Sequence, residues 1–119
     1  MGVIWPQEIR LAKDRRALTV SFDNGETHLL SAEYLRTHSP SAEVQGHSPE
    51  QRQTVAGKAD VQILKVEPVG NYAVRLAFDD LHETGIFSWA YLLRLGREYE
   101  TRWPAYLEEL AEKGLARSR

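Results

Sequence analysis

Three of the four histidines of this chain lie in two turn-rich segments. His38 and His47 belong to the first segment, and His82 belongs to the second. Imidazole is a common ligand of zinc, nickel, copper and iron, and three imidazoles leave an open position like that of a catalytic site. Glu43 or Glu83 could add a carboxylate ligand or orient a ring. The sequence therefore permits a metal site made of His38, His47 and His82.

The segment around His38 also has interpretations that need no metal. A loop histidine beside a proline commonly bonds to backbone groups, and spacing alone is weak evidence for ligation. The residues after His38 could instead form a loop that contacts another protein, made of Ser39, Pro40, Ser41, Glu43 and Val44. The metal-binding and metal-free interpretations both stay open on the sequence.

Several other kinds of site are absent or incomplete. The chain has no cysteine, which excludes disulfides, thiolate ligands and a cysteine nucleophile. Gly57-Lys58 lacks the earlier glycine of a P-loop, because Arg52 occupies that position. No histidine has a carboxylate two residues later, as an iron-dependent oxygenase requires, and no Gly-x-Ser-x-Gly motif marks a hydrolase. We therefore expect that the protein is not an enzyme.

Charge and hydropathy narrow the class of protein. Lysine and arginine number 15 against 17 acidic residues, which gives a net charge of −2 and no basic surface for nucleic acid. No apolar run approaches the roughly 20 residues that span a bilayer, and the first residues lack a signal-peptide pattern. The sequence predicts a soluble cytoplasmic protein without a nucleic-acid or membrane partner.

Alternation of apolar and polar residues predicts a series of short strands. The expected strands are residues 9–12, 18–22, 27–30, 61–66, 72–78 and 86–87. Asn24-Gly25 favours a type I′ turn, because both residues accept positive φ angles. We expect Tyr72 to face inward on its strand and His28 to face solvent.

Capping residues predict three helices. Ser31 caps the first, which is short, and Ser88 caps the second, which ends at Gly96. The third covers about 102–113, with Pro104 in its first turn. The other long segments are an N-terminal arm, 1–7, and a loop, 37–60, whose length is unusual in a compact domain.

Two parts of the chain resemble each other. Residues 28–36 match 85–92 at an offset of 57, and residues 20–23 match 76–79 at an offset of 56. Each copy has a hairpin, a capping serine and a short helix, and each is too small to bury its own apolar face. We therefore expect an α+β fold over 1–119 as one domain. Antiparallel strands form two ββα-like units, with short peripheral helices and a C-terminal helix.

From about Trp5 to Glu100 the chain resembles the gamma-butyrobetaine hydroxylase-like N-terminal domain family. The resemblance rests on Leu18-x-Val20-x-Phe22-Asp23-Asn24-Gly25, Tyr34-Leu35-Arg36-x-His38-Ser39-Pro40-Ser41-Ala42-Glu43-Val44, Gly70-Asn71-Tyr72-Ala73 and Gly85-Ile86-Phe87-Ser88-Trp89. In that family the domain occurs alone in bacteria, fused to carnitine-pathway 2-oxoglutarate oxygenases, or appended to Mrp-type scaffolds for iron–sulfur clusters. The resemblance implies an α+β fold.

The resemblance also bears on metal binding. In the oxygenase branch of the family, three cysteines and one histidine hold a structural zinc. The cysteine positions fall on Ser39, Ser41 and Val44 of this chain, and the histidine falls on His82. Serine is a poor zinc ligand and valine is none, so this zinc site does not carry over. The serines can instead order the loop without a metal.

Three functions follow as hypotheses. The first is a small non-enzymatic interaction or accessory module that docks on another protein and serves iron–sulfur or oxygenase machinery. The second is a metal-binding protein that uses the loop histidines, with zinc as the cofactor, whereas the first needs no cofactor. The third is a small-molecule sensor with a cleft between the two units. The sequence does not determine the oligomeric state.

Overall fold

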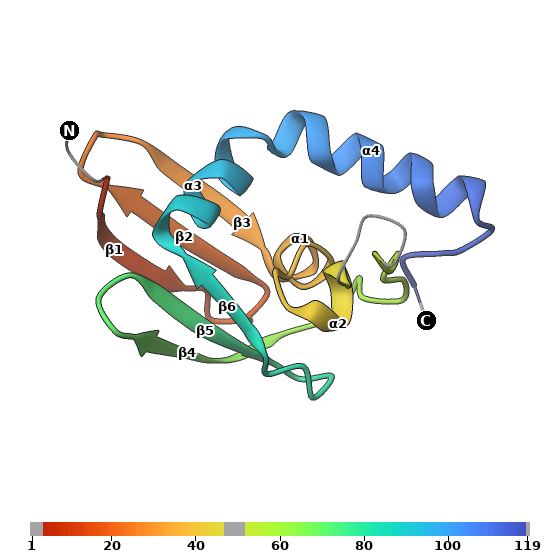
Figure 1. Ribbon diagram of the computed structural model, residues 1–119, viewed down its shortest axis with the longest axis horizontal. Coiled ribbons are helices and arrows are strands. Elements are labelled where there is room, and N and C mark those ends of the chain that lie inside the picture. Colours follow the sequence, from red (N-terminus) through yellow and green to blue (C-terminus); the bar gives the residue numbers. More distant parts are fainter. Residues whose placement is uncertain (1–3, 47–51, 119) are drawn as a thin grey trace.

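The computed structural model describes residues 4–46 and 52–118, and these residues form two antiparallel three-stranded sheets and four helices. The sheets lie at one end of the molecule, α1 and α2 lie near its middle, and most of α4 extends toward the other end (Figure 1). The first sheet contains β1 (Pro6–Leu11), β2 (Ala17–Phe22) and β3 (Thr27–Ser31). The second sheet contains β4 (Ile63–Val69), β5 (Ala73–Phe78) and β6 (Gly85–Ser88). The helices are α1 (Ala32–Thr37), α2 (Ala42–Gln45), α3 (Trp89–Arg97) and α4 (Tyr99–Glu112). The predicted α+β class is confirmed.

The two predicted units are present, and each begins with one further antiparallel strand. The order is β1-β2-β3 followed by α1 in the first unit, and β4-β5-β6 followed by α3 in the second. Both helices have the predicted serine cap. The Ser31 hydroxyl accepts a hydrogen bond from the Tyr34 backbone N–H at 3.0 Å, and Ser88 accepts one from Tyr91 at 3.1 Å. Such a cap satisfies a helix N–H that has no partner within the helix.

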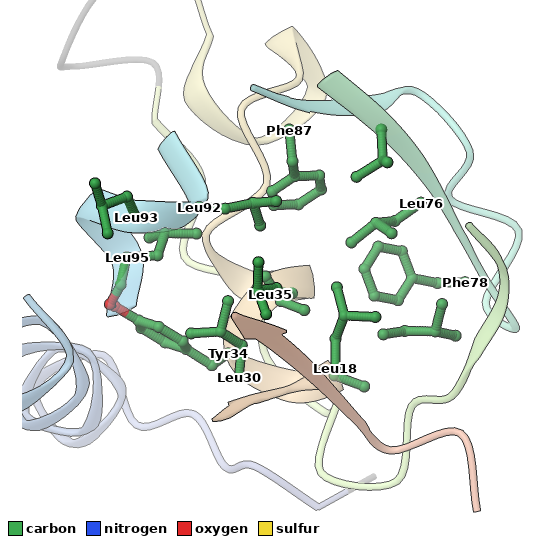
Figure 2. Close-up of a cluster of buried hydrophobic side chains, with 14 of the residues drawn as sticks. Leu18, Leu30, Tyr34, Leu35, Leu76, Phe78, Phe87, Leu92, Leu93 and Leu95 are labelled. Carbon is green, nitrogen blue, oxygen red and sulfur yellow. The ribbon is translucent and has the colours of Figure 1, made fainter. Parts of the chain in front are cut away.

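The two units exchange a pair of tyrosine hydrogen bonds. The Tyr34 hydroxyl donates to the Leu95 carbonyl at 2.7 Å, and the Tyr91 hydroxyl donates to the His38 carbonyl at 2.6 Å. Tyr91 lies 57 residues after Tyr34, and Leu95 lies 57 residues after His38. Each unit therefore gives the other the same bond, as in a two-fold arrangement of two copies. Figure 2 shows the Tyr34 hydroxyl directed toward the helix that carries Leu95.

The core lies where the inner faces of the two sheets meet α1 and α3 (Figure 2). Strand alternation supplies one apolar face per sheet. Burial of each large apolar side chain stabilises the fold by about 1.5–3 kcal/mol. The largest fully buried side chains are Tyr34, Phe22, Phe78, Phe87, Leu18, Leu30, Leu35, Ile63, Leu76, Leu92, Leu95 and Val20.

The turn prediction at Asn24-Gly25 is wrong in type. Gly25 has a φ of 90°, whereas Asn24 is not among the residues with positive φ. The Gly25 N–H donates to the Phe22 carbonyl, and the Phe22 N–H donates to the Glu26 carbonyl. This is a three-residue hairpin loop in which only the glycine is left-handed.

Gly96 does not end its helix, and His28 does not face solvent. α3 continues to Arg97, and a Cβ atom on Gly96 would lie 2.4 Å from Cγ of His28. The glycine therefore makes room for the histidine ring, which also lies 3.1 Å from Glu26. The close contact between the two units explains both corrections.

The other element boundaries also differ in detail. α4 starts at Tyr99, three residues before the predicted start, so Pro104 lies inside the helix. The loop predicted over 37–60 contains α2, and the predicted arm is shorter because β1 begins at Pro6. Tyr72 is exposed, because it lies in the turn before β5. Within the described ranges, no helix combines the length and apolarity that crossing a membrane requires.

Replacing Tyr34 or Tyr91 by phenylalanine removes one hydroxyl and keeps the ring. Each change should lower the free energy of unfolding by about 1 kcal/mol or more, because a carbonyl of the other unit loses its donor. Urea denaturation measures this quantity.

Tyr72→Phe is the matched control, since Tyr72 is exposed and its hydroxyl has no partner among the described residues. Equal stability of all three variants would contradict the role given to the reciprocal bonds.

Candidate functional site

His82 is the centre of a buried polar cluster between the two turn-rich segments. Its Nε2 lies 2.9 Å from the Ser39 hydroxyl and 3.4 Å from the Ser41 hydroxyl. Its Nδ1 lies 3.2 Å from a carboxylate oxygen of Glu43. The structure thus brings together four of the residues that the sequence singled out. Of the rest of the predicted contact loop, Val44 is buried beside them.

The partners of His82 determine where its proton lies. A carboxylate only accepts hydrogen bonds, so Nδ1 carries the proton and donates to Glu43. Nε2 then accepts from the serine hydroxyls. Burial lowers the pKa of His82, and the positive charge of Arg36 lowers it further, against the opposing effects of Glu43 and Asp80. The ring is therefore neutral at pH 7.

Local chain geometry explains how the serines reach the ring. α1 ends at Thr37, and the carbonyl of His38 is held by Tyr91, so Ser39 starts the loop from a fixed point. On the other side, a Cβ atom on Gly85 would lie 2.6 Å from the Ser39 hydroxyl oxygen. Only a glycine at the start of β6 allows this approach.

The carboxylate of Asp80, two residues before His82, also has three partners. Its carboxylate accepts hydrogen bonds from Arg36 at 2.7 Å and from the His82 backbone N–H at 3.2 Å, and it forms an ion pair with Lys58 at 2.6 Å. Burial by itself raises the pKa of Asp80, but the hydrogen bonds from Lys58 and Arg36 lower it overall. The carboxylate therefore stays charged at neutral pH.

Between these two held residues, Leu81 projects into solvent. Its side chain is 86% exposed, and its φ is 72°. The Leu81 N–H donates to the Phe78 carbonyl, as the Gly25 N–H donates to the Phe22 carbonyl in the first hairpin. Leu81 thus occupies the position where the other unit has a glycine. A residue with a Cβ in this conformation costs roughly 1–2 kcal/mol.

Sequence reasoning missed Leu81. The signal was present, because the repeat at an offset of 56 aligns Leu81 with Gly25. In that alignment a leucine occupies the position of a left-handed glycine. Leucine rarely adopts this conformation, so such a position is a candidate for a functional role.

The residues at the family's zinc position do not fit a zinc ion. Two serine hydroxyls lie against one imidazole, and both nitrogens of that imidazole have protein partners. The remaining position is Val44, which is buried and carries no ligand atom. Across residues 4–46 and 52–118, no three histidine, aspartate or glutamate side chains are grouped so that they could hold a metal.

Of the three histidines in the predicted metal site, His38 and His82 belong to the described residues. His38 bonds elsewhere, because its Nδ1 lies 3.0 Å from the Tyr34 carbonyl and 3.0 Å from the Thr37 hydroxyl. His47 lies outside the described residues. A site of His38, His47 and His82 therefore stays a prediction.

The bonds from Ser39 to His82 to Glu43 have the connectivity of a hydrolase triad. However, Ser39 is 0% exposed, and its hydroxyl packs against Gly85. A catalytic serine hydroxyl must be accessible to the substrate carbonyl, and the buried Ser39 hydroxyl is not accessible. The cluster is therefore a set of structural hydrogen bonds that joins the two loops.

Acid should destabilise the protein through its neutral histidines. Burial, aided by Arg102 and Arg52, lowers the pKa of His38 from 6.5 to about 4, and the pKa of His82 is lowered as well. The unfolded chain then binds protons first, so the free energy of unfolding should fall as the pH drops from about 6.5 toward 4. Urea midpoints at pH 7, 6 and 5 measure the slope.

His38→Gln should reduce this slope, because it removes one of the two groups. A midpoint that stays constant from pH 7 to pH 5 in the wild-type protein would contradict the assignment of neutral buried rings.

Comparisons with known proteins agree with this geometry. The chain is similar to a protein with an NMR solution structure, at 43% identity and a TM-score of 0.84, over 98% of this chain and 92% of the other. A second NMR structure matches at 42% identity and a TM-score of 0.82, over 97% and 86%. A crystal structure of a DUF971 family protein of unknown function from Acidithiobacillus ferrooxidans matches at 43% identity and a TM-score of 0.64, over 76% and 91%.

Among curated proteins, none matches this chain. The model of the family described as gamma-butyrobetaine hydroxylase-like, N-terminal, matches residues 9–93, which include β2 to β6 and the His82 cluster. The match covers more than half of the chain and confirms the resemblance seen in the sequence. The chain belongs to the gamma-butyrobetaine hydroxylase-like, N-terminal family.

Proposed function

We propose that this protein is a docking module that binds another protein through the loop 79–84, with Leu81 as the central contact. One observation carries the proposal: a leucine with an 86% exposed side chain occupies a left-handed backbone position. A single exposed leucine is ordinary. An exposed leucine that also destabilises its own loop has no role in folding.

The loop is organised to present this side chain. Asp80 is held by Arg36, Lys58 and a backbone N–H, and His82 is held by two serines and a glutamate. The backbone at Leu81 therefore loses little conformational freedom when a partner binds. Such preorganisation raises affinity, because less conformational entropy is lost on association.

The charges around Leu81 indicate the kind of partner. Asp79 and Glu83 are exposed on the same loop, and the Glu43 side chain beside His82 is 63% exposed. A complementary surface has an apolar pocket for Leu81 with lysine or arginine side chains around it. Partners in iron–sulfur or oxygenase machinery, which the resemblance implies, belong to this proposal.

The variant Leu81→Gly distinguishes an effect on the stability of the fold from an effect on partner binding. Glycine adopts positive φ without a steric cost, so the variant should be as stable as wild type or more stable, by up to about 1 kcal/mol. It should lose the partner, since the central contact is gone. Affinity capture from a native extract, with quantified recovery, measures binding, and urea denaturation measures stability.

Leu29→Ser is the control. Leu29 is also exposed, at 70%, but lies on β3 away from the loop, so this variant should recover the partner as wild type does. The proposal fails if Leu81→Gly recovers the same partner in the same amount. It also fails if the wild-type protein recovers none.

A further inference from the structure

A cavity of about 180 Å³ lies beside the C-terminal end of α1, bounded by α4 and the segment 52–55. It includes neither Leu81 nor His82, so it is independent of the docking loop. The polar residues of its wall that matter here are His38, Arg52, Thr54, Arg102, Tyr106 and Glu109.

His38 lines this cavity, and the bonds of its ring determine where the ring proton lies. Its Nδ1 lies 3.0 Å from the Tyr34 carbonyl, which only accepts, so Nδ1 carries the ring proton. Nε2 is then an unprotonated nitrogen, and it has no hydrogen-bond partner among the described residues. The rings of Tyr34 and Tyr106 hold the imidazole, with centroids 4.6 Å and 5.8 Å away.

Two guanidinium groups lie on the same wall. Arg102 binds Glu98 through Nε at 2.8 Å, and its guanidinium also interacts with Tyr91, whose ring centroid lies 5.9 Å from Cζ. Arg52 uses one terminal amino group to bind Glu109 at 2.7 Å. Both charges act on the His38 ring through space, since each lowers its pKa. A fork of N–H donors suits a carboxylate.

We propose that the cavity binds a short 2-hydroxy carboxylate. Arg102 and Arg52 bind the carboxylate, and the hydroxyl of the ligand donates a hydrogen bond to Nε2 of His38. The volume is that of about six water molecules at ~30 Å³ each, which suits an acid as small as lactate.

The test is an NMR titration of isotope-labelled full-length protein with sodium lactate, at constant ionic strength. Propionate is the matched ligand, because it keeps the carboxylate and lacks the hydroxyl. Lactate should give saturable shifts at the amides of His38, Thr54 and Tyr106, and propionate should bind at least fivefold more weakly. Propionate leaves Nε2 of His38 without a hydrogen-bond donor, and this unpaired acceptor accounts for its weaker binding.

Two variants test the assigned roles. Arg102→Gln should weaken lactate binding at least tenfold, whereas His38→Phe should make lactate and propionate bind alike. Arg94→Gln is the control, because Arg94 pairs with the same Glu98 from α3 and does not line the cavity. Binding by Arg94→Gln should equal that of wild type.

Shifts that do not saturate, or equal binding of the two acids by the wild-type protein, would overturn the proposal. Unchanged lactate binding by Arg102→Gln would overturn it as well. The comparison of the two acids uses the wild-type protein only, so it stands even if a variant fails to fold. None of these outcomes depends on Leu81, so docking and ligand binding can fail separately.

Discussion

The reciprocal bonds from Tyr34 and Tyr91 are the constraint on which the rest of the structure depends. Each hydroxyl donates to a carbonyl near the end of the other unit's helix, so neither unit can shift without breaking both bonds. The bond to the His38 carbonyl has a direct consequence for the site. It fixes the start of the loop that carries Ser39, and Ser39 then meets His82 from the other unit. The polar cluster thus depends on the contact between the two units.

The repeat shows where the two units have the same structure and where they differ. His28 packs on Gly96, and Ser39 packs on Gly85, so the first unit supplies both side chains and the second unit supplies both glycines. Gly85 and Gly96 lie 57 residues after His28 and Ser39, so each glycine occupies the position where the first unit has one of these side chains. The hairpin loops differ in the opposite sense, because Leu81 of the second unit replaces a glycine of the first. The His82 cluster joins the two loops by hydrogen bonds and holds the residue that follows the strained leucine.

Much of the fold followed from local pattern. Alternation and the two capping serines predicted the strands and the first two helices, and the match between two parts of the sequence predicted the two units. Gly96, His28 and Tyr72 were misassigned because their positions depend on contacts between units or on a turn, which local pattern does not contain. The family resemblance grouped Ser39, Ser41 and Val44 with His82, and the sequence separately offered Glu43 as a carboxylate that could orient a histidine ring. The structure places Ser39, Ser41 and Glu43 on the ring of His82. The leucine at a glycine position, and the cavity at His38, required the backbone geometry.

The central claim is that hydrogen bonds alone hold Leu81 in a fixed position. Backbone ¹⁵N relaxation of the chelator-treated protein tests it most directly at the amides of residues 79–84. An order parameter of about 0.85 at Leu81, equal to that of the strands, is the result that this account predicts. A value below about 0.6, or one that recovers only when zinc is added, would contradict it.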